Sequence, residues 1–130
     1  MERKDILKGL ELPKEYESNL NILLERINEL ESKFGKFKFI VTSGFRDMAN
    51  HLRIYKEKGI TDKSKIPMKS KHLTCEAVDI SDPEFVLTKW CKENEKVLEE
   101  IGLWCEDDTS VKRLHLQIVA PASGKRFFKP

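Results

Sequence analysis

A short segment near the C-terminal end, residues 113–119, alternates polar and apolar side chains. The polar positions are Arg113, His115 and Gln117, and the apolar ones are Leu114, Leu116 and Ile118. Because successive side chains point to opposite faces of a strand, this pattern predicts a half-buried β-strand. Its apolar face belongs to the core, so we expect His115 to point toward a polar, concave surface.

A second segment contains an S-x-H-x6-D pattern that includes His72 and Asp79. Residues 76–81 are predicted to form a short strand. If this strand pairs with residues 113–119, Asp79 and His115 converge, and His72 can reach the same point from the preceding loop. Two imidazoles and one carboxylate can hold zinc with one coordination position open to water, which is typical of catalytic zinc. Each of the three residues alone would be read as an ordinary polar residue.

The rest of the pattern predicts an α+β fold with a small antiparallel sheet flanked by helices. Apolar residues at three- and four-residue steps predict a helix that begins at Pro13 and ends at Gly35. We further expect a strand over 36–42, a turn over 43–46, a helix capped by Asp47 that runs to about Lys58, a long connection over 59–71, a helix from Pro83 to about Ile101 and a strand over 103–105. The second long helix should bury Phe85, Val86, Trp90, Val97, Leu98 and Ile101.

Length and composition predict one domain over residues 1–130, with a helical segment 1–35, a site-bearing core 36–119 and a basic, irregular tail 120–130. The net charge of +2 is too small to indicate a nucleic-acid partner. Three cysteines argue against a disulfide framework and for synthesis in a reducing compartment. We see neither a signal peptide nor a membrane segment, so we expect no membrane partner, and we expect a monomer.

Three motifs in this order resemble one family. They are Ser43-Gly44-Phe45-Arg46, the S-x-H-x6-D pattern ending in Ala77-Val78-Asp79, and Leu114-His115-Leu116-Gln117. Together they are similar to the zinc D-alanyl-D-alanine carboxypeptidases, which include phage endolysin peptidases and share their fold with hedgehog signalling domains. The resemblance spans residues 39–119.

The resemblance implies a zinc peptidase acting on peptidoglycan stem peptides, made in the host cytoplasm and reaching the wall after release or as part of a virion. It implies that His72, Asp79 and His115 are the zinc ligands and that Arg46 holds a substrate carboxylate or carbonyl. Ser70 and Gln117 are further candidates for substrate binding. Alternatively, Ser70 and Thr74 hydrogen-bond around the ligands or cap local backbone.

Two positions depart from the family pattern. Cys75 stands where the family often has glycine, and it could compete for zinc as a thiolate or, as we expect, fill space as a small residue. Lys112 stands where the family often has an acidic general base. We therefore look for the base in the acidic loop, first at Glu106 and then at Asp107. If neither serves, the chain is a non-catalytic zinc-binding domain or a virion- or tail-associated wall-binding protein.

Four other features allow two interpretations each. His51 could be a fourth ligand, but we expect a surface histidine on a helix. Trp90 could be a substrate platform, but its apolar stripe favours the core, and for Trp104 both interpretations stay open. The tail residues 125–129 could bind the wall or nucleic acid, but we expect a solvated tail packed by its two phenylalanines.

Overall fold

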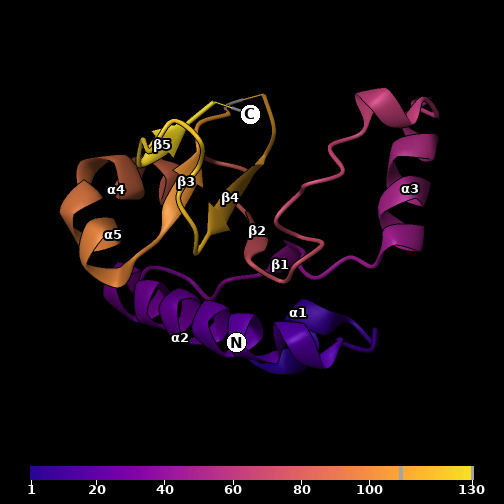
Figure 1. The fold of residues 1–130 in the computed structure, drawn as a ribbon. Helices are drawn as coiled ribbons and strands as arrows, with labels where there is room; N and C mark the ends of the chain where they lie inside the picture. Colours follow the sequence, from indigo (N-terminus) through magenta and orange to yellow (C-terminus); the bar gives the residue numbers. More distant parts are fainter. Residues whose placement is uncertain (109, 130) are drawn as a thin grey trace.

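The computed structural model of the protein describes residues 1–108 and 110–129. Within them the chain forms an α+β fold in which helices flank a five-stranded sheet of order β1-β2-β4-β3-β5 (Figure 1). The strands are β1 (Val41–Ser43), β2 (Ala77–Ser81), β3 (Trp104–Glu106), β4 (Arg113–Gln117) and β5 (Phe127–Phe128). The helices are α1 (Arg3–Leu7), α2 (Glu17–Phe34), α3 (Met48–Glu57), α4 (Val86–Glu93) and α5 (Glu95–Ile101), with short 3₁₀ turns at Lys14–Tyr16 and Lys63–Lys65.

The sequence pattern predicts an antiparallel sheet, but the sheet is mixed. The pairs β1–β2, β2–β4 and β3–β4 are antiparallel, but β5 runs parallel to β3, with Cys105 opposite Phe127. The prediction of an irregular tail is wrong at this point, because Cys105 donates its backbone N–H to the carbonyl of Arg126 at 2.8 Å. The tail therefore protects the outer edge of β3.

Helix α2 forms as the sequence pattern predicts. Its buried side chains recur at three- and four-residue steps: Leu20, Leu23, Ile27, Leu30 and Phe34. Gly35 ends the helix in the left-handed conformation, with φ 64°. The α-helix begins at Glu17 rather than Pro13, because the intervening residues form a 3₁₀ turn.

The first strand is shorter than predicted and begins later. Residues 36–40 lie outside the sheet, because Phe39 donates its backbone N–H to the Glu31 carboxylate at 2.6 Å instead of to a strand. The rings of Phe37 and Phe39 pack on Phe34. Strand pairing starts at Val41 and includes Ser43, whereas the sequence pattern predicts Ser43 in the turn.

The predicted helix over 83–101 is two helices that meet at Asn94, whose φ of −124° and ψ of 41° are not helical. The first begins at Val86 rather than Pro83, because the Asp82 carboxylate accepts the backbone N–H groups of Leu87 and Thr88 at 2.9 and 2.8 Å. The prediction that Val86 is buried is wrong, since it is 38% exposed and Leu87 is buried in its place. Trp90 is partly buried and packs edge-on against Phe34, as the core interpretation predicts.

The two faces of the sheet have different surroundings. Val78, Ile80, Leu114 and Leu116 point into the core together with buried residues of α2, α4 and α5. The opposite face carries the polar residues of β2 and β4 and looks toward the long connection that follows α3 (Figure 1). No helix of the described residues is long and apolar enough to cross a membrane.

Candidate metal centre

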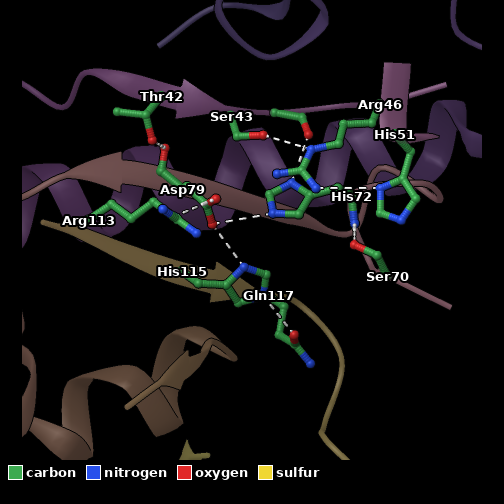
Figure 2. A network of polar contacts seen from close by, with 11 residues as sticks. Thr42, Ser43, Arg46, His51, Ser70, His72, Asp79, Arg113, His115 and Gln117 are labelled. Carbon is green, nitrogen blue, oxygen red and sulfur yellow. Dashed lines mark hydrogen bonds and ion pairs between the residues drawn. The ribbon is translucent and has the colours of Figure 1, made fainter. Parts of the chain in front are cut away.

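His72, Asp79 and His115 converge on the polar face of the sheet (Figure 2). Asp79 and His115 are direct partners in the β2–β4 ladder, and His72 reaches the same point from the turn before β2. One ligand atom from each residue lies within 4.8 Å of the other two. This group could hold a metal ion, and the predicted convergence of the three residues is confirmed.

The hydrogen bonds of His72 decide which of its nitrogens faces the group. Its Nδ1 lies 2.8 Å from the carbonyl oxygen of Gly44. A carbonyl only accepts, so Nδ1 carries the proton and donates it. The other nitrogen, Nε2, lies 3.3 Å from Oδ1 of Asp79. A neutral His72 therefore presents the lone pair of Nε2 to the aspartate.

His115 is oriented in the same way by Gln117. The side-chain amide nitrogen of Gln117 donates to the carbonyl of Val119 at 2.9 Å, which leaves its oxygen 2.9 Å from Nε2 of His115. That oxygen must accept, so Nε2 is protonated and Nδ1 faces Oδ1 of Asp79 at 2.9 Å. Gln117 lines the cavity and orients His115, and its predicted role in substrate binding stays a prediction.

Three acceptor atoms therefore meet at one point when both imidazoles are neutral. Lone pairs that face one another at these distances repel, so the arrangement requires additional protons or a cation between them. Neutral imidazoles whose other N–H is held by a carbonyl oxygen are the usual form of histidine ligands. Two such imidazoles and one carboxylate suit zinc, and they also suit other divalent transition metals.

The charges in the group are strongly coupled. Burial alone would raise the pKa of Asp79, but in the absence of a metal the hydrogen bonds that His115 and His72 donate when they carry an additional proton outweigh it and lower that pKa below its usual range. Burial opposes the charged form of His115, yet the adjacent Asp79 raises the pKa of the imidazole. Arg113 approaches the second carboxylate oxygen, Oδ2, at 3.2 Å. Asp79 is therefore held as an anion and is ready to bind a cation.

The carbonyl that fixes His72 belongs to a glycine with a structural requirement. A Cβ built on Gly44 would lie 2.3 Å from the backbone oxygen of Ile6 in α1. Only glycine permits this approach, which is completed by a hydrogen bond from the backbone N–H of Phe45 to Ile6 at 2.9 Å. Helix α1 thus supports the turn that orients His72.

The ligand group lines a cavity of about 600 Å³, and this cavity has room for a substrate. Of the two candidate bases, Glu106 lines this cavity, and its burial raises the pKa of the carboxyl group. Asp107 instead pairs with Lys92 at 2.8 Å and with Lys129 at 3.4 Å. Strand alternation explains the difference, since the β3–β4 register puts Glu106 on the face that carries His115.

Arg46 lines the same cavity and is held from two sides (Figure 2). Its Nε donates to the hydroxyl of Ser43 at 3.0 Å, and its terminal nitrogen NH1 lies 3.5 Å from Nδ1 of His51. Among the described residues no carboxylate lies within ion-pair distance of Arg46. The guanidinium is positioned and available for an anionic ligand.

The expectation that His51 lies on the surface is wrong, because its side chain is fully buried. Nε2 of His51 donates to the carbonyl of Pro67 at 2.9 Å, so Nδ1 is the acceptor that faces Arg46. His51 is also outside the ligand group. It links the long connection to the arginine, a role for which the sequence gives no local signal.

Of the remaining candidate residues Ser70, Thr74 and Trp104, only Ser70 lines the cavity. The hydroxyl of Ser70 accepts the backbone N–H of His72 at 3.4 Å. Thr74 shares its one hydroxyl proton between the Glu76 carboxylate and the carbonyl of Lys71, so it caps local backbone. Trp104 stacks under Arg126, with 4.4 Å between the guanidinium carbon and the ring centre.

Cys75 is buried in the core and lies outside the ligand group of the described residues. Burial raises the pKa of its thiol to about 11, which disfavours the thiolate that a metal needs. Its φ of 59° falls in the left-handed region that glycine adopts readily. The residue therefore fills space, as expected, at a backbone position suited to glycine.

Comparison with protein-family models, with curated proteins and with solved structures finds no match to this chain.

Proposed function

We propose that this chain is a zinc-dependent peptidase that hydrolyses D-amino-acid-containing peptides of bacterial peptidoglycan. One observation carries the proposal: three ligand lone pairs converge in a cavity that also contains a half-buried carboxyl group and an arginine with no carboxylate within ion-pair distance in the described part of the chain. The resemblance of the ordered motifs to D-alanyl-D-alanine carboxypeptidases supplies the substrate class. We further propose that the protein acts as a monomer and reaches the wall after release from the host cytoplasm or with a virion.

In this proposal His72, Asp79 and His115 hold the ion. When bound, zinc would supply a water nucleophile at neutral pH and polarise the scissile carbonyl. The hydrogen bonds from His72 to Gly44 and from His115 to Gln117 fix the tautomer of each neutral imidazole, so that the nitrogen facing Asp79 is the one free to bind the ion. Arg113 contacts Oδ2 of Asp79, so the other carboxylate oxygen, Oδ1, stays directed at the two imidazoles.

Glu106 is the group best placed to move a proton. A general base must reach the attacking water, and its pKa should lie near the working pH. Burial raises the pKa of Glu106 above that of an ordinary glutamate. Its carboxylate would accept a proton from the water and return it to the leaving amine. Asp107 is bound to two lysines and points away from the cavity.

Arg46 would hold the carboxylate or carbonyl of the substrate. Its planar fork can donate two parallel hydrogen bonds to a carboxylate, and Ser43 and His51 limit the orientations it samples. Holding the substrate in one orientation beside the ligand group contributes to rate because it removes the entropy cost of alignment.

One observation favours a non-catalytic zinc-binding domain instead. The position that carries an acidic base in the resembling family is Lys112 here, and its side chain is exposed. A wall-binding domain of the same fold would need the ligand group but not Glu106. The two functions therefore differ in what Glu106 does.

The test combines metal analysis with digestion of purified peptidoglycan and mass spectrometry of the products. We expect one zinc per chain and released peptides from the wild type. Glu106→Gln should keep the zinc and lose ~10²-fold or more in rate, while the matched variant Asp107→Asn keeps its rate. Zinc without any released peptide would favour the non-catalytic domain, and bound iron in place of zinc would contradict the proposed chemistry.

A further inference from the structure

A second cavity of about 410 Å³ adjoins the metal cavity. The two share four wall residues: Arg46, Lys58, Asp79 and Arg113. The second cavity is completed by Thr42 and Ser43 of β1, by Ile54 of α3 and by Lys112 before β4. Asp79 thus separates two spaces, with the histidine ligands on one side only. A substrate bound at the ligand group has room to extend one substituent across Asp79.

The second cavity is strongly cationic. Four basic side chains line it, and Asp79 is its one carboxylate among the described residues. That carboxylate is already used, since Oδ1 faces both histidines and Oδ2 faces Arg113. The whole chain has a net charge of only +2, so this concentration is local. Such a space attracts an anion and raises its local concentration.

The individual cations are placed to bind a ligand. Lys58 lies over the ring of Tyr55, with 5.0 Å between Nζ and the ring centre, which holds it at the cavity edge. Arg113 uses Nε for Asp79, and among the described residues its two terminal nitrogens have no carboxylate within ion-pair distance. Lys112 has no carboxylate within ion-pair distance in the described part of the chain. These groups can all donate hydrogen bonds to a carboxylate.

We infer that the second cavity is a subsite for an additional substrate carboxylate, distinct from the one assigned to Arg46. The preferred substrate is then a peptide with a second carboxylate next to the cleaved region. This inference rests on the proposed peptidase function for the identity of the ligand as a peptide. The binding itself requires only the cavity and its cations. Lys112, which departs from the family pattern, acquires a role in specificity.

The test compares two synthetic stem peptides that differ in one group. The first is L-Ala-γ-D-Glu-L-Lys-D-Ala-D-Ala, and the second carries D-isoglutamine, which replaces the free α-carboxylate with an amide of the same shape. Affinities are measured by isothermal titration calorimetry with the full chain carrying Glu106→Gln, to suppress hydrolysis. We expect the carboxylate peptide to bind about 10-fold more tightly, the usual effect of a hydrogen bond to a charged group.

Variants then locate the subsite. Lys58→Met and Lys112→Met keep the apolar part of each side chain and remove its charge. Each should reduce the ratio of the two peptide affinities, and the double variant should bring this ratio close to one. Lys96→Met, an exposed lysine on α5, is the matched control and should keep the full preference. Equal affinity of both peptides for the parent protein overturns the inference, as does a preference that survives in the double variant.

The outcome is separable from that of the proposed function. If the chain is no peptidase, the wild type releases no product from either peptide, whatever the affinity ratio. If only the subsite is wrong, the wild type hydrolyses both peptides with equal efficiency. Raising the salt concentration should reduce the preference of the parent protein without abolishing it, because the exposed Lys58 and Lys112 are screened while the half-buried Arg46 and Arg113 are screened less.

Discussion

Zinc should stabilise the fold by an amount that depends on His115. On the proposed function the metal would bind the native arrangement of the three ligands in preference to the unfolded chain, so the free energy of unfolding should rise with free zinc. At 100 times the dissociation constant the gain is about 2.7 kcal/mol. For a chain of 130 residues, an unfolding entropy of about 2.1 cal/mol/K per residue converts this to a rise in Tm of about 10 °C.

His115→Ala should remove almost all of that rise. Loss of a supporting hydrogen bond to a ligand already weakens metal binding 10- to 100-fold, and loss of the ligand itself should cost at least the upper figure. At the same zinc concentration a 100-fold weaker site gains only about 0.4 kcal/mol, which is a shift of about 1.5 °C. The comparison uses the zinc-dependent increment alone, because the substitution also alters the metal-free protein.

His51→Ala is the matched control, since His51 is buried but lies outside the ligand group. Its melting temperature should be lower than that of the wild type, yet zinc should still raise it by about 10 °C. The assay is thermal unfolding followed by circular dichroism, with a chelator or with zinc buffered at a measured multiple of the wild-type Kd. A full increment in His115→Ala, or none in the wild type, refutes the assignment of the ligands.

Three further predictions concern the surroundings of the ligand group. Arg46→Lys keeps the charge but loses the planar fork, so turnover should fall at least ~10-fold while the free energy of unfolding changes by less than ~1 kcal/mol; unchanged turnover would show that Arg46 does not bind substrate. Gln117→Leu removes the acceptor that fixes His115, so zinc affinity in a chelator competition should fall 10- to 100-fold, and unchanged affinity would contradict the orienting role. In metal-free protein the raised pKa of His115 stabilises the fold fully below about pH 6.5, and this stabilisation is lost as pH rises through the folded pKa. The increase in Tm caused by zinc should instead grow over that range, because protons compete with the metal for the ligands. Thermal unfolding at about pH 6 and 8, with and without zinc, checks both directions of change.

The sequence was sufficient to predict that Asp79 and His115 meet because strand periodicity is strict, whereas His72 lies in a turn where periodicity gives no direction. The alternation in residues 113–117 places His115 on the face of the sheet that points away from the core, and the alternation in β2 places Asp79 on the same face. Burial of Leu114 and Leu116 then leaves only one face on which the two polar residues can meet. The only assumption needed was that the two strands pair, and the direct Asp79–His115 partnership confirms it.

Other features had no local signature. His51 is polar and lies on a short helix, so its burial depends on the long connection that brings the Pro67 carbonyl to it. The separation of α4 from α5 depends on Asn94, whose side chain donates to the carbonyl of Trp90 at 2.8 Å. Strand β5 contains only two residues, Phe127–Phe128, which form a strand because β3 offers an unpaired edge. In each case the partner is distant or the segment is too short for periodicity to be informative.

The choice of Glu106 over Asp107 as the candidate general base depends on the alternation of side chains along β3. Side-chain length and anchoring favoured Glu106 in the sequence, but both acids remained candidates. The register of β3 against β4 adds a decisive geometric reason, because Trp104 pairs with Gln117 and Cys105 with Leu116. Continuing that register brings Glu106 beside His115 on the cavity face, while Asp107 follows on the opposite parity and binds lysines.

The same register that builds the core also assembles the ligands. A slip of one residue between β2 and β4 would place Asp79 opposite Leu114 or Leu116 and would turn Val78 and Ile80 toward the cavity. Such a slip would expose these two core side chains, each of which contributes about 1.5–3 kcal/mol when buried. The packing of these apolar residues therefore holds two imidazoles and an anionic carboxylate together despite the mutual repulsion of their lone pairs. A cation that enters the group meets ligands that are already in place, so little of its binding free energy is needed to order them.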